Sequence, residues 1–224
     1  MFTSLLIWSS LLFIICLLFS FIYFAYSLKI TPTPSSRTSR LICLQFCQKL
    51  TTLLPPLKSS LNFIDLGSGW GGVLFYLARK GPSNWRYIGY EIMPIAYIWS
   101  WILSLFFSHV QIKSKRFQTH LLDSSHPTLF FSYLCPEQMH ILAQMFQQKK
   151  TSQTLLLTLT FTLPHHTPLL TIPIPHSLNQ SLEIYLFNWP ELENLLIKVF
   201  PMYHLNTEDQ SLNEKPLEFD TDLK

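Results

Sequence analysis

The chain has 224 residues, which is enough for one domain of ordinary size with short appendages. With 48% apolar and 13% charged residues, the chain is unusually apolar for a soluble protein. Its net charge of +3 is the sum of a basic body and an acidic segment at residues 205–224. The chain has no Arg/Lys run with interleaved aromatic residues, so its sequence does not indicate nucleic acid as a partner. The spacing of its four cysteines matches neither a metal site nor a disulfide framework.

The first 28 residues contain no charged side chain and are long enough, as a helix, to span about 30 Å of hydrocarbon. A cleaved signal peptide usually has a positive start and a shorter apolar core, so an anchor is the favoured interpretation. Lys29, Arg37 and Arg40 follow this stretch and predict, by the positive-inside rule, a cytoplasmic body. We therefore expect a single-pass transmembrane helix over 1–28 in contact with the lipid bilayer, a linker over 29–40 and a domain over 41–204.

A glycine-rich turn follows the first apolar strand of the domain, at residues 61–66. Its spacing is Asp65-x-Gly67-x-Gly69-x-Gly71, and the helix behind it ends at Gly81. Glycines let backbone amides approach a ligand closely, and the N-terminus of the helix favours polar or anionic groups. An acid at the end of the strand suits a cationic amino group better than the pyrophosphate bound by Gly-x-Gly-x-x-Gly turns.

A second short strand at 86–91 ends in Glu91, which lies 26 residues after Asp65. This acid is placed to accept hydrogen bonds from two ribose hydroxyls. Pro94 then begins another helix. The succession strand, helix, strand, helix predicts an α/β fold with a parallel, doubly wound sheet.

Residues 92–107 are apolar enough to resemble a second membrane span. Spanning would put the two flanking strands on opposite sides of the bilayer, where they could not share a sheet. We therefore expect a helix with one face on the sheet and the other against the membrane or a partner.

The rest of the domain alternates apolar runs with one amphipathic helix. Residues 205–224 lack periodicity and are expected to form a disordered acidic tail. The later elements are predicted strands at 110–112, 129–134 and 154–163, a helix at 137–148, and an antiparallel pair of strands at 169–174 and 182–187.

The glycine turn together with Glu91 resembles motifs I and II of class I S-adenosylmethionine-dependent methyltransferases. With the segments at 88–94, 130–137 and 161–164, the chain is also similar to the membrane-anchored lysine methyltransferases typified by the enzyme for ATP synthase subunit c. The resemblance implies a mostly parallel, seven-stranded Rossmann-like sheet, S-adenosylmethionine as cofactor, no metal, and a lysine acceptor in a membrane or membrane-adjacent protein. The cofactor-binding residues that it implies are Asp65, Gly67, Ser68, Gly69, Gly71, Glu91 and Phe117.

Two departures from this family concern the cofactor. Trp70-Gly71-Gly72 stands where members usually have Asp-Gly-Arg, and residues 113–118 lack the acid that often meets the adenine amino group. Adenine contact then rests on Phe117, on a backbone group or on Gln118.

Methyl transfer needs alignment more than acid–base power, so no compact catalytic cluster is expected. Tyr133 and Glu137 follow the fourth strand, at the end expected to lie beside the cofactor, and they are the candidate catalytic residues. The alternative for Tyr133 is a tyrosine in the core, and the alternative for Glu137 is an exposed acid at the start of a helix. The chain lacks Asn/Asp-Pro-Pro-Tyr, which disfavours N-methylation of nucleic acid. Methylation of a lipid or quinone-like small molecule, and a catalytically silent membrane-bound interaction module, remain alternative hypotheses.

Overall fold

The computed structural model describes residues 2–27, 35–53, 61–117, 127–148, 153–175 and 180–200. Its strands are β1 (Asn62–Leu66), β2 (Arg86–Tyr90), β3 (Val110–Lys113), β4 (Thr128–Ser132), β5 (Thr154–Leu159), β6 (Leu170–Pro173) and β7 (Ser181–Phe187). Its helices are α1 (Phe2–Ser27), α2 (Arg37–Leu53), α3 (Gly72–Lys80), α4 (Pro94–Ser104), α5 (Pro136–Gln148) and α6 (Pro190–Val199).

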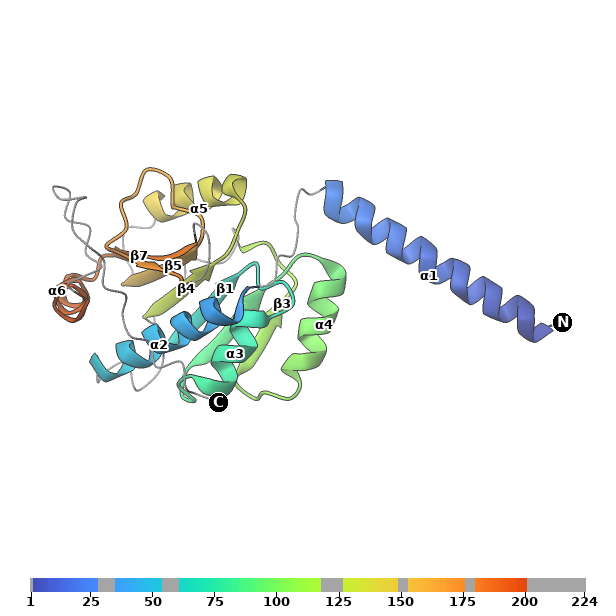
Figure 1. Ribbon diagram of the computed structural model, residues 1–224, viewed down its shortest axis with the longest axis horizontal. Coiled ribbons are helices and arrows are strands. Elements are labelled where there is room, and N and C mark those ends of the chain that lie inside the picture. The colour runs from blue at the N-terminus through green and yellow to red at the C-terminus, as the bar shows by residue number, and fades with distance from the viewer. Residues whose placement is uncertain are drawn as a thin grey trace.

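The strands form one seven-stranded sheet in the order β3-β2-β1-β4-β5-β7-β6 (Figure 1). Strands β1 to β5 are parallel, and β7 runs antiparallel to both β5 and β6. This confirms the predicted α/β fold with a terminal antiparallel pair. The strand order reverses between β1 and β4, and ligands of open α/β sheets bind at the carboxyl ends of the strands beside such a reversal.

Helices cover both faces of the sheet, so the central strands are buried on both sides. Every residue of β4 and β5 is buried, which explains why these strands read as continuous apolar runs rather than alternating ones. One core cluster joins the sheet to buried residues of α2, α3 and α6, and the other joins it to α5.

Two element boundaries differ from the predictions for identifiable reasons. Helix α2 begins at Arg37, inside the predicted linker, because the Ser36 hydroxyl accepts a hydrogen bond from the Ser39 N–H at 3.0 Å and caps the helix. Strand β5 ends at Leu159, since the next residue, Thr160, has a φ of 74° that no strand accommodates.

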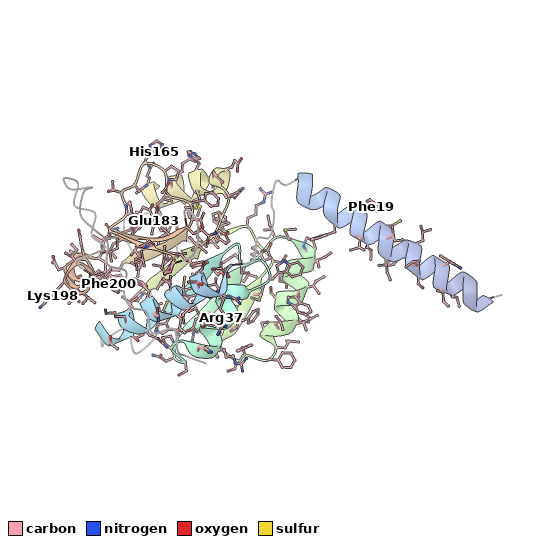
Figure 2. The ribbon with its side chains drawn as sticks, in the orientation of Figure 1. Phe19, Arg37, His165, Glu183, Lys198 and Phe200 are labelled. Carbon is pink, nitrogen blue, oxygen red and sulfur yellow. The ribbon has the colours of Figure 1, made fainter. Side chains whose placement is uncertain are left out.

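Helix α6 was not predicted from the sequence. It carries Phe200 just beyond its last turn (Figure 2). The Phe200 ring stacks on Phe46 of α2 with 5.8 Å between the ring centroids. The contact joins the C-terminal part of the described chain to the first helix of the α/β body.

Among the residues that the structure describes, no helix is both long and apolar enough to cross a membrane. The predicted single-pass anchor, and the localisation inferred from it, are therefore wrong. The rest of the linker, at 29–34, and the acidic tail at 205–224 lie outside the described residues.

The apolar stretch at 92–107 forms α4 beside the sheet, as expected from the strands that flank it. Ala96 and Ser100 are its buried residues, while Ile98, Trp99 and Ile102 are exposed on its outer face.

Candidate functional site

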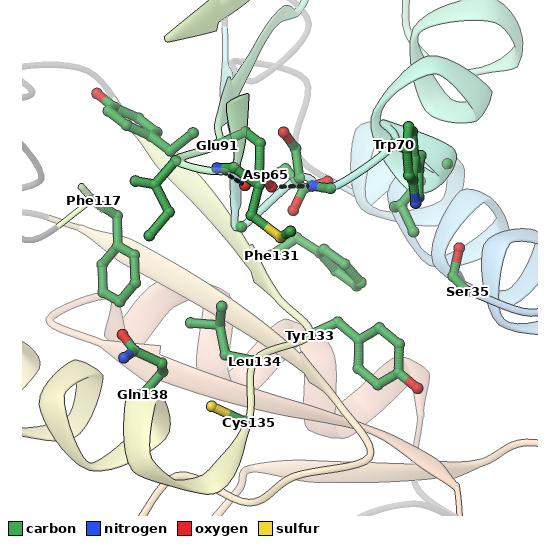
Figure 3. A pocket seen from close by; sticks show the side chains of 18 of the residues that line it. Ser35, Asp65, Trp70, Glu91, Phe117, Phe131, Tyr133, Leu134, Cys135 and Gln138 are labelled. Atoms are coloured by element: carbon green, nitrogen blue, oxygen red, sulfur yellow. Dashed lines mark hydrogen bonds between the residues drawn. The ribbon is translucent and has the colours of Figure 1, made fainter. Parts of the chain in front are cut away.

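A cavity of about 570 Å³ opens at the carboxyl ends of β1, β2 and β4, beside the reversal in strand order. Its walls come from the segment before α2, the glycine turn, the ends of β2 and β4, and the first turns of α5. In Figure 3, Asp65 and Glu91 lie between two ends of the cavity. Phe117 marks one end, and Tyr133 lies at the other with Trp70 and Ser35.

The glycine turn after β1 needs glycine for different reasons at its three positions. Gly67, Gly69 and Gly71 all have positive φ, at 86°, 53° and 78°. A Cβ at Gly67 would lie 2.7 Å from the Leu134 side chain, and one at Gly71 would overlap the Phe75 ring. A Cβ at Gly69 would meet no atom within 4 Å, so this backbone faces open space beside the cavity.

Glu91 connects the glycine turn to the end of β2 through hydrogen bonds. One carboxylate oxygen accepts a hydrogen bond from the Gly69 N–H at 2.6 Å, and the other accepts one from the Met93 N–H at 2.7 Å. Sequence reasoning assigned Glu91 only to ribose. Each carboxylate oxygen can accept a further bond, so the acid can hold the turn and still receive a ligand hydroxyl.

Asp65 lies on the floor of the cavity with 3% of its surface exposed. Burial, and secondarily the nearby charge of Glu91, raises the pKa of Asp65 to about 8. A cationic group placed beside this carboxyl would stabilise its charged form.

Two more of the predicted cofactor residues line the cavity. Ser68 lines the cavity, but its hydroxyl is buried beside Gly89 and has no hydrogen-bond partner among the described residues. Phe117 presents its ring to the cavity, and Gln118 lies outside the described residues. Gly71 is not part of the lining and acts through the shape of the turn.

The two candidate catalytic residues lie in different places. Tyr133 lines the cavity at the end opposite Phe117 (Figure 3). Glu137 is exposed in the first turn of α5 and does not line the cavity. The structure thus brings Tyr133 together with the cofactor candidates and does not bring Glu137 to them.

Sequence reasoning missed several residues that contribute to the site. Ser100 of α4 is fully buried, and its hydroxyl donates a hydrogen bond to the Gly69 carbonyl at 2.8 Å. A serine in the middle of a charge-free apolar helix was the available signal. Ser35 and Arg40 also line the cavity, and a Cβ at Gly72 would lie only 3.3 Å from the Ser35 hydroxyl. Gly72 therefore lets the segment before α2 approach the turn closely.

No protein-family model matches the chain, and no curated protein matches its sequence. Among solved structures, an RNA methyltransferase from Salinibacter ruber in complex with S-adenosyl-L-homocysteine is similar, with a TM-score of 0.52 and 14% identity over 69% of this chain and 94% of that one. The 23S rRNA methyltransferase ErmE has a TM-score of 0.49 and 12% identity over 75% of each chain. The putative methyltransferase yhhF from Escherichia coli has a TM-score of 0.45 and 10% identity over 69% and 88%. At 14% identity the first likeness shows the fold, which is that of class I methyltransferases.

Proposed function

We propose that this chain, which has the class I methyltransferase fold, is an S-adenosylmethionine-dependent methyltransferase that binds its cofactor across the carboxyl ends of β1 and β2. The observation that carries the proposal is the pair of buried acids, Asp65 and Glu91, on either side of one glycine turn and within one cavity. The similarity to a fold solved with S-adenosyl-L-homocysteine supports it.

The residues present fit such a ligand. Asp65 would pair with the amino group of the methionine part of the cofactor. This cationic group would stabilise the ionised carboxylate of Asp65, whereas burial alone favours its neutral form. Glu91 would accept the ribose hydroxyls with its remaining lone pairs. The open backbone at Gly69 offers a further polar contact.

When bound, S-adenosylmethionine supplies a methyl group made electrophilic by a positively charged sulfur. The chain then has to orient the acceptor and exclude water from the line of attack. Tyr133 and the exposed indole of Trp70 are at the end of the cavity away from Phe117, where they can form an aromatic wall for the acceptor (Figure 3).

The proposed acceptor is a lysine side chain of a protein. The resemblance of residues 130–137 and 161–164 to lysine methyltransferases supports this choice. A lysine must lose its proton before it attacks, and an apolar wall disfavours the charged ammonium. The role of Glu137 stays a prediction, and so does the location of the acceptor in or beside a membrane, which the family resemblance implied.

A small apolar molecule is a second candidate acceptor. Cys135, Ile141 and Phe161 give the cavity an apolar wall that is suited to an apolar ring or chain. The structural neighbours described as RNA methyltransferases make RNA a third outcome to be tested.

Calorimetry with S-adenosyl-L-homocysteine tests the cofactor assignment. We expect the wild-type chain to bind, and Glu91→Ala to bind at least about tenfold more weakly because it loses the ribose acceptor and the hold on the turn. If the alanine variant does not fold, Glu91→Gln replaces it in the test, because glutamine keeps the size and shape of the side chain. Glu193→Ala, at an exposed position of α6, is the matched control. No heat from the folded wild type, or equal affinity in all variants, would contradict the proposal.

The acceptor is identified by incubating a lysate with the protein and methyl-labelled S-adenosylmethionine. Label in methyl-lysine of a protein supports the lysine proposal. Label in the organic extract or in RNA would replace it. Cofactor binding without labelling of any fraction would favour a silent interaction module.

A further inference from the structure

Among the residues that the structure describes in the segment after β3, none contributes a carboxylate to the Phe117 end of the cavity. That segment reads Ser114-Lys115-Arg116-Phe117, and Lys115 and Arg116 line the cavity as well. An exocyclic amino group of a purine needs a hydrogen-bond acceptor. Among the described residues, a ligand base placed beside Phe117 would therefore find its partner on another element.

Gln138 also lines the cavity, and Figure 3 draws it on the same side of the cavity as Phe117. It is partly buried, and its side-chain amide has no hydrogen-bond partner among the described residues. A partly buried amide at a cavity wall without a protein partner is a group that a ligand can satisfy.

The rotation of α5 directs Gln138 to the cavity. Met139, the next residue, is 1% exposed in the core, and its sulfur accepts a hydrogen bond from the Ser132 hydroxyl at 3.3 Å. Ile141, three residues after Gln138 and on the same side of the helix, also lines the cavity. The packing of Met139 against the sheet thus places the 138/141 side of α5 over the ligand space.

We infer that Gln138 is a specificity-determining residue that reads the group at C6 of the cofactor's purine base, an inference that rests on the proposed function. A glutamine amide has a carbonyl oxygen and an NH₂ group, and turning it over exchanges the two. It can accept a hydrogen bond from the amino group of adenine, or donate one to the carbonyl group of hypoxanthine. A carboxylate at this place could only accept.

This difference gives the site a measurable signature. The wild-type chain tolerates hypoxanthine in place of adenine, whereas a chain with a carboxylate at position 138 rejects it. Rejection follows because a carboxylate facing a carbonyl leaves two acceptors opposed with no proton between them.

The experiment measures dissociation constants of the full chain for S-adenosyl-L-homocysteine and S-inosyl-L-homocysteine by calorimetry. We expect the two wild-type values to agree within about fivefold, because the amide pairs with either group. Gln138→Glu, which is nearly isosteric, should raise the inosyl-to-adenosyl ratio to about tenfold or more. Gln138→Leu should weaken both ligands by about tenfold while leaving their ratio near the wild-type value.

Gln144→Leu is the matched control, since it makes the same change at an exposed position of α5. Thermal unfolding of each variant checks that it is folded. If Gln138→Leu does not fold, the Gln138→Glu variant still tests the inference. If wild type binds S-adenosyl-L-homocysteine but Gln138→Leu binds it equally well, or if Gln138→Glu leaves the ratio unchanged, this inference is overturned and the proposed function stands. Absence of binding by wild type would instead overturn the proposed function.

Discussion

Asp65 is a carboxylic acid on the cavity floor, where little water reaches it, and its pKa is raised to about 8. Below this pH the carboxyl in the empty site is mostly neutral. S-adenosylmethionine carries an ammonium and a sulfonium cation, and both interact more favourably with the ionised carboxylate. Binding at neutral pH therefore has to remove a proton from Asp65.

We predict that the affinity for S-adenosylmethionine rises as the pH is raised from 6 to 8, and that protons are released on binding at pH 7. The sign follows because the bound state holds fewer protons at Asp65 than the free state. Calorimetry in buffers of different ionisation enthalpy measures the number of protons released. Asp65→Asn should abolish most of the release, and equal release by wild type and variant would exclude Asp65 as its source.

Helix α4 contacts the glycine turn through the Ser100 hydroxyl. Its exposed outer face carries Ile98, Trp99 and Ile102, but its inner face places the fully buried Ser100 against the Gly69 carbonyl. The same glycine donates its N–H to Glu91. Gly69 is thereby held from both sides, by α4 and by the end of β2.

We predict that Ser100→Ala weakens binding of S-adenosyl-L-homocysteine by about fivefold, since a lost hydrogen bond of roughly 1 kcal/mol loosens the turn. Ser104→Ala is the control, because the Ser104 hydroxyl bonds only the Trp101 carbonyl of its own helix, at 2.7 Å. Circular dichroism should show both variants folded. If Ser100→Ala binds as tightly as Ser104→Ala, α4 does not position the turn.

Helix α2 connects the site to the C-terminal part of the described chain. Arg40, near its start, lines the cavity, while further along Phe46 stacks on Phe200. Lys49 places its ammonium 4.7 Å from the centre of the Phe200 ring. The α2–α6 contact thus closes the core on the side of the sheet that α2 covers.

We predict that Phe200→Ala lowers the free energy of unfolding by about 3 kcal/mol, the usual cost of removing a buried aromatic ring. Urea unfolding followed by tryptophan fluorescence measures this loss. Asn194→Ala, on the exposed side of α6, should change stability by less than about 0.5 kcal/mol. Equal stability of the two variants would show that the α2–α6 contact contributes little to the core.

Patterns along the chain were sufficient to predict the α/β class, the glycine turn with its two acids, and the antiparallel pair at the end of the sheet. These features depend on local chemistry, because apolar runs make strands, glycines permit positive φ, and prolines begin or stop helices. The same local rules did not reveal α6, and the anchor that they predicted over residues 1–28 was wrong.

The tertiary structure was needed to learn which distant segments meet at the site. Ser35, Ser100 and Gln138 lie on three separate segments, and only Ser100, a serine within an apolar helix, is marked by its neighbours in the sequence. The positions of Ser100 and Gln138 follow from how α4 and α5 are rotated on the sheet, which is set by the packing of buried partners such as Ala96 and Met139. Glu137, although it is adjacent to Gln138 in sequence, turns away to solvent. A rotation of about 100° per residue therefore separates an exposed acid from an amide that lines the cavity.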